Sequence, residues 1–232
     1  GNRPVLPGYD GVDIERIRGQ AVAALGNRTI TWSERDFVFV GRFVDKKNLF
    51  TLIEGFAAYS HAAGDCGRRL QLIGSGSLEA ALRDRAAALG VVDRVIFTGF
   101  LDAAEVSARL AEALALVLVS TEEQWGLVVN EALAVGLPVL VSTAVGSRDA
   151  LVRNLINGFV VEPGSVDGIA EALRQLAASE QHWTRMSQAS HERAWLGDTD
   201  RLADAVEVLF DPQAREASAR LAEFASHLME TA

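Results

Sequence analysis

Residues 115–142 read ALVLVSTEEQWGLVVNEALAVGLPVLVS and contain the clearest indication of the fold class. An apolar run at 115–119 ends in a polar loop, and a second apolar run at 138–142 follows a segment with helical spacing at 127–135. Gly136 comes just past that segment, where a glycine commonly ends a helix. Continuous apolar runs on both sides of a helix are typical of parallel strands buried on both faces of a sheet.

The same alternation runs through most of the chain. Apolar runs that end at a glycine or a polar loop alternate with segments of helical spacing at least five times. This pattern predicts an α/β fold with a doubly wound, Rossmann-like parallel sheet. We expect strands at 37–40, 69–73, 95–98, 115–119, 138–142 and 159–161, and helices at 14–25, 48–63, 78–89, 103–113, 127–135 and 165–178.

The chain divides into three parts by composition. Residues 1–36 are rich in proline and glycine around one helical piece and form a leading segment. Residues 37–182 hold the alternating pattern and are expected to form the Rossmann-like domain. Residues 183–232 are alanine-rich and helical, and Pro212 divides them.

Composition excludes several classes of function. The charges sum to 22 − 31 = −9, which argues against a nucleic-acid partner. The apolar run at 114–119 is far shorter than the roughly 20 residues that span a bilayer. No secretory leader opens the chain, and Cys66 is the only cysteine, so we expect a reducing compartment, the cytoplasm.

Two glutamates are the strongest candidates for a functional role. Glu123 lies on the loop after the apolar run 115–119, and Glu131 lies eight positions later on the expected helix. Between them, the start of the helix offers free backbone N–H groups, which form a ready site for an anion. Two carboxylates beside an anion site suit a sugar nucleotide, because its hydroxyls flank a diphosphate. Taken singly, each glutamate could also be a solvated surface residue.

Two cations follow the first strand of the predicted sheet. Arg42 and Lys47 come just after 37–40, where the loops of such a sheet face the ligand. Each charge-assisted bond to a phosphate is worth roughly 1.5–3 kcal/mol. The alternative reading is two solvated loop charges, with Lys46 an equal candidate.

Other motifs carry less information. Gly74 and Gly76 allow a close backbone approach to a ligand, but they can equally make a tight turn. A third glycine at the dinucleotide spacing is missing, and the sequence has no P-loop. Asp198 and Asp200 form an Asp-x-Asp between helical stretches, which we interpret as a helix cap. The histidine spacing predicts no metal site.

In their order along the chain, these elements resemble the C-terminal, nucleotide-sugar-binding domain of retaining glycosyltransferases with the GT-B fold, the group 1 or family 4 type. The resemblance covers roughly residues 11–200. It rests on Val-Gly-Arg-Phe at 40–43 with Lys47, Leu-Ile-Gly-Ser-Gly at 72–76, Val-Ile-Phe-Thr-Gly-Phe at 95–100, the run from Glu123 to Glu131 continuing to 136–139, and Asn-Gly-Phe-Val-Val at 157–161.

The resemblance implies side-chain roles toward a nucleoside-diphosphate sugar. Arg42 and Lys47 neutralise the donor diphosphate as it leaves. Glu131 bonds the ribose hydroxyls, and Glu123 holds hydroxyls of the transferred sugar. No metal and no cofactor are then required, because the cations and the helix start stabilise the leaving group.

The resemblance also implies backbone roles. The N–H groups of Trp125 and Gly126 contact the sugar, and the backbone near Phe100 faces the nucleobase. Leu127 and Val128 offer their N–H groups to the phosphates. The full set of implied backbone contacts to the donor is Gly41, Gly74, Gly76, Phe100, Trp125, Gly126, Leu127 and Val128.

The sequence also departs from the family. Gln124 stands where glycine is common, Trp125 where phenylalanine is common, and residues 146–150 lack the usual Gly-Gly and Pro-Glu pairs. No second alternating sheet is present, so the N-terminal acceptor domain is missing and we expect little turnover by this chain alone. Any membrane-surface contact would be made through that domain. Two alternatives remain: a non-catalytic module that docks on a partner, and a related sugar-nucleotide epimerase.

Overall fold

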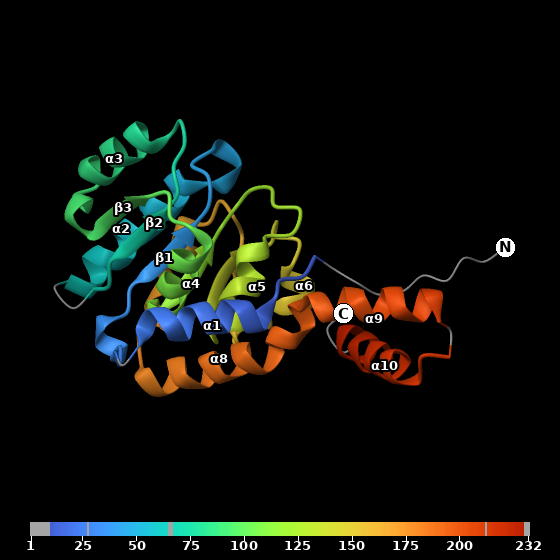
Figure 1. The fold of residues 1–232 in the computed structure, drawn as a ribbon. Helices are drawn as coiled ribbons and strands as arrows, with labels where there is room; N and C mark the ends of the chain where they lie inside the picture. Colours follow the sequence, from blue (N-terminus) through green and yellow to red (C-terminus); the bar gives the residue numbers. More distant parts are fainter. Residues whose placement is uncertain (1–9, 27, 65–66, 212, 230–232) are drawn as a thin grey trace.

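A single parallel sheet forms the centre of the computed structural model, which describes residues 10–26, 28–64, 67–211 and 213–229 (Figure 1). The sheet has the order β3-β2-β1-β4-β5-β6, and every neighbouring pair is parallel. This order confirms the doubly wound, Rossmann-like fold class. The strands are β1 (Phe37–Val40), β2 (Leu70–Ile73), β3 (Val95–Gly99), β4 (Ala115–Leu118), β5 (Val139–Ser142) and β6 (Gly158–Val161).

Helices cover both faces of the sheet. On one face α2, α3 and α7 pack together, and on the other α1, α4, α5 and α8 pack together. Figure 1 shows α9 and α10 as a hairpin that stands out to one side. The helices are α1 (Ile14–Leu25), α2 (Leu49–Ala63), α3 (Glu79–Ala88), α4 (Ala103–Glu112), α5 (Leu127–Ala134), α6 (Arg148–Leu151), α7 (Val166–Leu176), α8 (Glu180–Arg193), α9 (Thr199–Phe210) and α10 (Arg215–Met229).

The central strands are fully buried. Every residue of β4 and β5 is enclosed, as expected for strands that are covered by helices on both faces. The register pairs Phe37 of β1 with Leu70 of β2 and with Ala115 of β4. The carboxyl ends of all six strands therefore meet at one edge of the sheet, which is where open α/β sheets bind their ligands.

The expected division of the chain into three parts stays a prediction, and one of its boundaries lies within a helix. The division between 182 and 183 falls inside α8, which runs without a break from Glu180 to Arg193. The leading segment contributes α1, whose Ile14, Ile17 and Ala21 are buried. Residues 1–9, Cys66 and Pro212 lie outside the described residues. Among those that are described, no helix combines the length and the apolar character that a bilayer crossing requires.

Candidate functional site at the carboxyl edge of the sheet

The loops after β1 and β2 pack directly on each other. The Gly41 N–H donates to the Ile73 carbonyl at 2.9 Å, and the Phe43 N–H donates to the Ser75 carbonyl at 2.9 Å. A Cβ on Gly74 would lie 2.0 Å from the Gly41 oxygen, and one on Gly76 would lie 2.3 Å from the Phe43 oxygen. Contact between the two loops is therefore enough to require both glycines, and their backbone role toward a ligand stays a prediction.

Lys47 and Glu123 form an ion pair across the carboxyl edge. Lys47 ends a short 3-10 turn, Asp45–Lys47, while Glu123 lies on the loop between β4 and α5. Both side chains are only 14% exposed, and the Glu123 carboxylate also accepts from the Ser120 hydroxyl at 3.3 Å. Lys47 and Glu123 are expected from the sequence to have separate roles, whereas the structure brings their side chains together. An anion at this position would compete with Glu123 for the Lys47 ammonium.

Asn48 fixes the turn that carries Lys47, and the sequence analysis did not single it out. Its backbone is left-handed, with φ of 57°. Its amide group donates to the carbonyls of Val119 and Pro163 at 3.0 and 2.6 Å. An asparagine directly before a helix was the available indication, because asparagine tolerates this conformation and its amide bonds to backbone.

The loop from Glu123 to Gly126 is held from the side by the loop after β5. The Gly146 N–H donates to the Glu123 carbonyl at 2.9 Å, and the Ser147 N–H donates to the Trp125 carbonyl at 3.0 Å. Gly126 has φ of +91°, and a Cβ there would lie 3.1 Å from a Leu118 methyl group. The chain therefore turns sharply into α5, as the sequence predicted.

The start of α5 presents unpaired backbone donors. The N–H groups of Leu127 and Val128 donate no hydrogen bond to another described residue, whereas the Val129 N–H reaches the Gly126 carbonyl at 2.8 Å. Unpaired N–H groups and the positive end of the helix dipole favour an anion at this point. Glu123 lies on the loop that leads into α5, so its ion pair with Lys47 links the turn after β1 to this loop.

Glu131 lies in α5 and is half-buried beside α1. Burial raises the pKa of its carboxyl above the ordinary 4.5, and the positive charge of Arg16 on α1 partly offsets this. The carboxylate makes no hydrogen bond to another residue in the described ranges. A shielded carboxylate without a hydrogen-bond donor is a candidate for bonding to hydroxyl groups of a ligand.

The raised pKa of Glu131 predicts how stability depends on pH. The folded chain holds the Glu131 proton more tightly than the unfolded chain, so ionisation of this group opposes folding. The loss of folding stability that this ionisation causes is absent below pH 4.5. It grows as pH rises from there through the pKa of the folded state. We expect Glu131→Gln to remove this contribution to the fall in stability with rising pH. Urea unfolding of both proteins between about pH 4 and pH 7 measures it, and parallel curves would contradict the assignment.

Arg42 and Phe100 lie at the same edge without contacting the residues above. Arg42 is exposed, and its guanidinium makes no hydrogen bond or ion pair within the part of the chain that the structure describes. Phe100 follows β3, and its side chain is 82% exposed. In sheet order the predicted residues follow β3, β2, β1 and β4, which are four adjacent strands. Three inter-strand spacings give them a span of roughly 14 Å.

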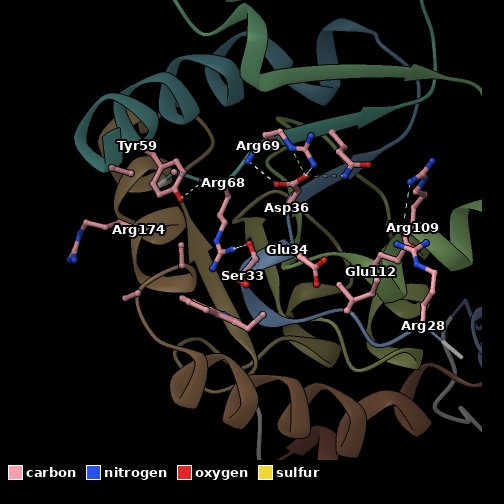
Figure 2. A pocket seen from close by; sticks show the side chains of 17 residues that line it. Arg28, Ser33, Glu34, Asp36, Tyr59, Arg68, Arg69, Arg109, Glu112 and Arg174 are labelled. Atoms are coloured by element: carbon pink, nitrogen blue, oxygen red, sulfur yellow. Dashed lines mark hydrogen bonds and ion pairs between the residues drawn. The ribbon is translucent and has the colours of Figure 1, made fainter. Parts of the chain in front are cut away.

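A large cavity lies at the opposite, amino edge of the sheet (Figure 2). It has a volume of about 1020 Å³ and includes residues that precede β1 and β2. Its arginines already have partners: Arg69 pairs with Asp36 at 2.8 Å, and Arg28 pairs with Glu112 at 3.0 Å. The Arg68 guanidinium donates to a backbone carbonyl and stacks on an indole ring at 4.2 Å. None of the predicted site residues lines this cavity.

Asp198 caps a helix, as the sequence predicted. Its side chain accepts from the Asp200 N–H at 3.2 Å at the start of α9. Across the described ranges, no three His, Cys, Asp or Glu side chains gather in a way that could hold a metal ion. The expectation that no metal or cofactor is required stays a prediction.

Comparison with protein families gives a match over most of the chain. The family described as "Glycosyl transferases group 1" matches residues 29–193, which is more than half of the sequence. A lipopolysaccharide core biosynthesis glycosyltransferase, LpsE of Rhizobium meliloti (strain 1021), is 35% identical over 153 residues, covering 66% of this chain and 42% of that protein.

A second relative extends the match. A GDP-mannose-dependent alpha-(1-6)-phosphatidylinositol monomannoside mannosyltransferase of Mycobacterium tuberculosis (strain ATCC 25618 / H37Rv) is 30% identical over 208 residues, covering 84% of this chain and 53% of that protein. The chain thus spans about half the length of these two curated relatives.

Solved structures share the fold. WaaG, a glycosyltransferase involved in lipopolysaccharide biosynthesis, aligns with a TM-score of 0.71 at 22% identity, covering 90% of this chain and 56% of that one. The C-terminal domain of a glycosyl transferase group 1 family protein, LpcC from Francisella tularensis, aligns with a TM-score of 0.67 at 22% identity, covering 80% of this chain and 97% of that one.

Proposed function

Since the chain belongs to the group 1 glycosyl transferases, we propose that it binds the nucleoside-diphosphate sugar from which a glycosyl group is transferred. The observation that carries the proposal is the grouping of unpaired α5 N–H donors, the Lys47–Glu123 pair and Arg42 along adjacent strand ends. A span of roughly 14 Å suits an elongated ligand better than a lone phosphate.

We assign each candidate residue to the part of the sugar nucleotide that its charge or hydrogen-bonding groups can bind. Arg42, Lys47 and the N–H groups at the start of α5 bind the diphosphate. Glu131 bonds the ribose hydroxyls, and Glu123 bonds hydroxyls of the sugar. The backbone beside Phe100 faces the base, and the N–H groups of the loop before α5 contact the sugar.

The proposed chemistry is retaining transfer that needs no metal. The bond between the anomeric carbon and the diphosphate oxygen breaks, the acceptor oxygen bonds to the anomeric carbon on the same face, and the acceptor proton passes to the oxygen of the leaving diphosphate. Negative charge develops on the leaving diphosphate, so fixed donors and cations around it stabilise the transition state. Arg42, Lys47 and the α5 N-terminus supply this stabilisation.

We propose that a domain of N-terminal type, outside the residues of this chain, supplies the site for the acceptor. Isolated, the chain then binds donor but turns over little. We place the reaction in the cytoplasm, where sugar nucleotides are made. Two similar proteins are named for lipopolysaccharide and phosphatidylinositol mannoside, which supports an acceptor at a membrane surface reached through the other domain.

A thermal-shift series tests the proposed donor binding. UDP-, GDP- and ADP-sugars are added to the wild type, Arg42→Ala, Glu131→Ala and a control, Arg109→Ala, from the amino-edge cavity. One nucleotide at 100 times its Kd should stabilise the wild type and the control by roughly 2.7 kcal/mol. The two site variants should lose most of that gain. Equal stabilisation of all four proteins would contradict the assignment of the site.

A second candidate function has one observation in its favour. The α9 helix exposes Leu202, Val206, Leu209 and Phe210, which share one face by their helical spacing. Such an apolar stripe suits a module that docks on a partner without catalysis. If no nucleotide stabilises the wild type, this reading takes first place. The epimerase reading gains no support from the contacts at the carboxyl edge.

A further inference from the structure

A buried asparagine joins the donor loop to a distant part of the chain. Asn130 lies in α5 and is 1% exposed. Its carbonyl oxygen accepts from the Trp125 indole N–H at 3.0 Å. Its amide nitrogen donates to the Asp10 carbonyl at 3.0 Å and to the Gly197 carbonyl at 3.1 Å. One side chain thus connects three segments that are far apart in sequence.

The partners of Asn130 leave its amide group only one orientation. An indole N–H can only donate, and a backbone carbonyl can only accept. The amide oxygen must therefore face Trp125, and the NH₂ group must face the two carbonyls. Turning the amide over would set donor against donor and acceptor against acceptor in a buried place, where unpaired polar groups are costly.

The two carbonyls belong to a narrow pair of segments that we call the strap, residues 10–12 and 197–199. The Val12 N–H donates to the Gly197 carbonyl at 2.9 Å, and the Thr199 N–H donates to the Val12 carbonyl at 3.1 Å. The strap joins the start of α1 to the start of α9. The strap is therefore one link between α1 and the α9–α10 hairpin.

Glycines make the strap fit closely. A Cβ on Gly11 would lie 2.8 Å from the Thr199 nitrogen, and one on Gly197 would lie 2.5 Å from the Asn130 amide nitrogen. The two strap segments and Asn130 are thus in close contact at both glycines. The position of the strap and that of the Trp125 ring are consequently linked through rigid, directional contacts.

We propose that Asn130 is a positioning residue that couples the strap to the donor loop. Trp125 precedes Gly126, the residue directly before α5, and Asn130 precedes Glu131. When the strap sits as in this structure, the Asn130 bonds hold the Trp125 ring and the α5 start in the geometry that receives the diphosphate. When the strap is displaced, that geometry loosens and donor affinity falls. The inference rests on the proposed function, because its readout is nucleotide binding.

The test uses three single variants of this chain and the double variant that combines the first two. Gly11→Ala forces the two strap segments apart without changing Asn130, and Trp125→Phe removes the indole donor while keeping an aromatic ring. Gly19→Ala in α1 is the control, since no atom lies within 4 Å of its added Cβ. If Gly11→Ala does not fold, Val12→Ala loosens the strap instead. Binding of UDP, GDP and ADP is measured by calorimetry well below the unfolding temperature, so that stability differences do not enter.

The proposal predicts non-additive losses. Gly11→Ala and Trp125→Phe should each weaken nucleotide binding by roughly fivefold or more, the usual lower range of coupling between sites. Together they should weaken it little more than either alone, because both break the same link. Gly19→Ala should bind as the wild type does. Hydrogen exchange of the Trp125 indole N–H, followed by NMR without nucleotide, should speed up in Gly11→Ala.

The outcomes separate this inference from the proposed function. Unchanged indole exchange in Gly11→Ala, or additive losses of affinity, would overturn the coupling while leaving the donor site standing. Faster exchange with unchanged affinity would show that Asn130 only stabilises the fold and would overturn its positioning role. A wild type that binds none of the three nucleotides would overturn the proposed function and the positioning role with it.

Discussion

Replacing Lys47 with methionine will weaken binding of a nucleoside diphosphate by roughly 10- to 100-fold, which corresponds to the loss of one charge-assisted hydrogen bond. Lys47 lies at the carboxyl edge, its side chain is only 14% exposed, and its sole charged partner among the described residues is Glu123. Methionine keeps much of the volume and removes the charge. Titration calorimetry of the wild type and of Lys47→Met with UDP, GDP and ADP measures the effect.

The neighbouring lysine provides a matched control. Lys46 pairs with Glu122 at 3.7 Å, and both side chains are well exposed, so this pair contributes little. Lys46→Met should change nucleotide affinity by no more than about twofold, because an exposed ion pair contributes little free energy. In Lys47→Met the Glu123 carboxylate is shielded and unpaired, and adding Glu123→Gln should recover stability without recovering affinity. Equal losses in the two lysine variants would contradict a specific role for Lys47.

Gly74→Ala is expected to lower the free energy of unfolding by at least about 3 kcal/mol, more than the other substitutions proposed here. The added Cβ would lie 2.0 Å from the Gly41 oxygen, and Gly74 has φ of +129°, a conformation that side chains rarely adopt. The obstacle is backbone, so no side-chain rotation relieves it. Urea unfolding by circular dichroism measures the loss, and a variant that does not fold at all agrees with the prediction.

Gly64→Ala separates the cost of backbone conformation from the cost of contact. Gly64 has φ of +59°, and among the described residues other than its chain neighbours no atom lies within 4 Å of an added Cβ. Its substitution should therefore cost only about 1–2 kcal/mol, the penalty for a left-handed residue with a side chain. If Gly74→Ala costs no more than Gly64→Ala, the loops after β1 and β2 are not in the tight contact that the structure shows.

The sequence predicted the fold because the physical cause of each element is local. A strand buried on both faces must be continuously apolar, and β4 and β5 were expected to within one residue at each end for that reason. The short helix α6 was not expected, since four residues are too few to show helical spacing. The change of composition at 182–183 falls inside α8, because composition alone does not mark where a helix ends.

The site was predicted only as far as strand order allows. Placing residues after strands located Arg42, Lys47 and Glu123 at one edge, because parallel strands end on the same side. The sequence could not show that Lys47 and Glu123 pair, since they are 76 positions apart. Nor could it show that Asn130 bonds to Gly197, 67 positions away. A buried polar residue in the apolar run Val-Val-Asn-Glu was the one available indication, because such a group needs hydrogen-bonding partners.

The most direct test of donor binding at the carboxyl edge is a two-dimensional amide NMR titration with the nucleoside diphosphate that stabilises the chain. We predict that the largest shifts appear at Gly74, Phe100, Leu127 and Val128, while amides beside the amino-edge cavity, such as Glu34 and Arg109, stay in place. Shifts confined to that cavity, with the start of α5 unmoved, would contradict the account.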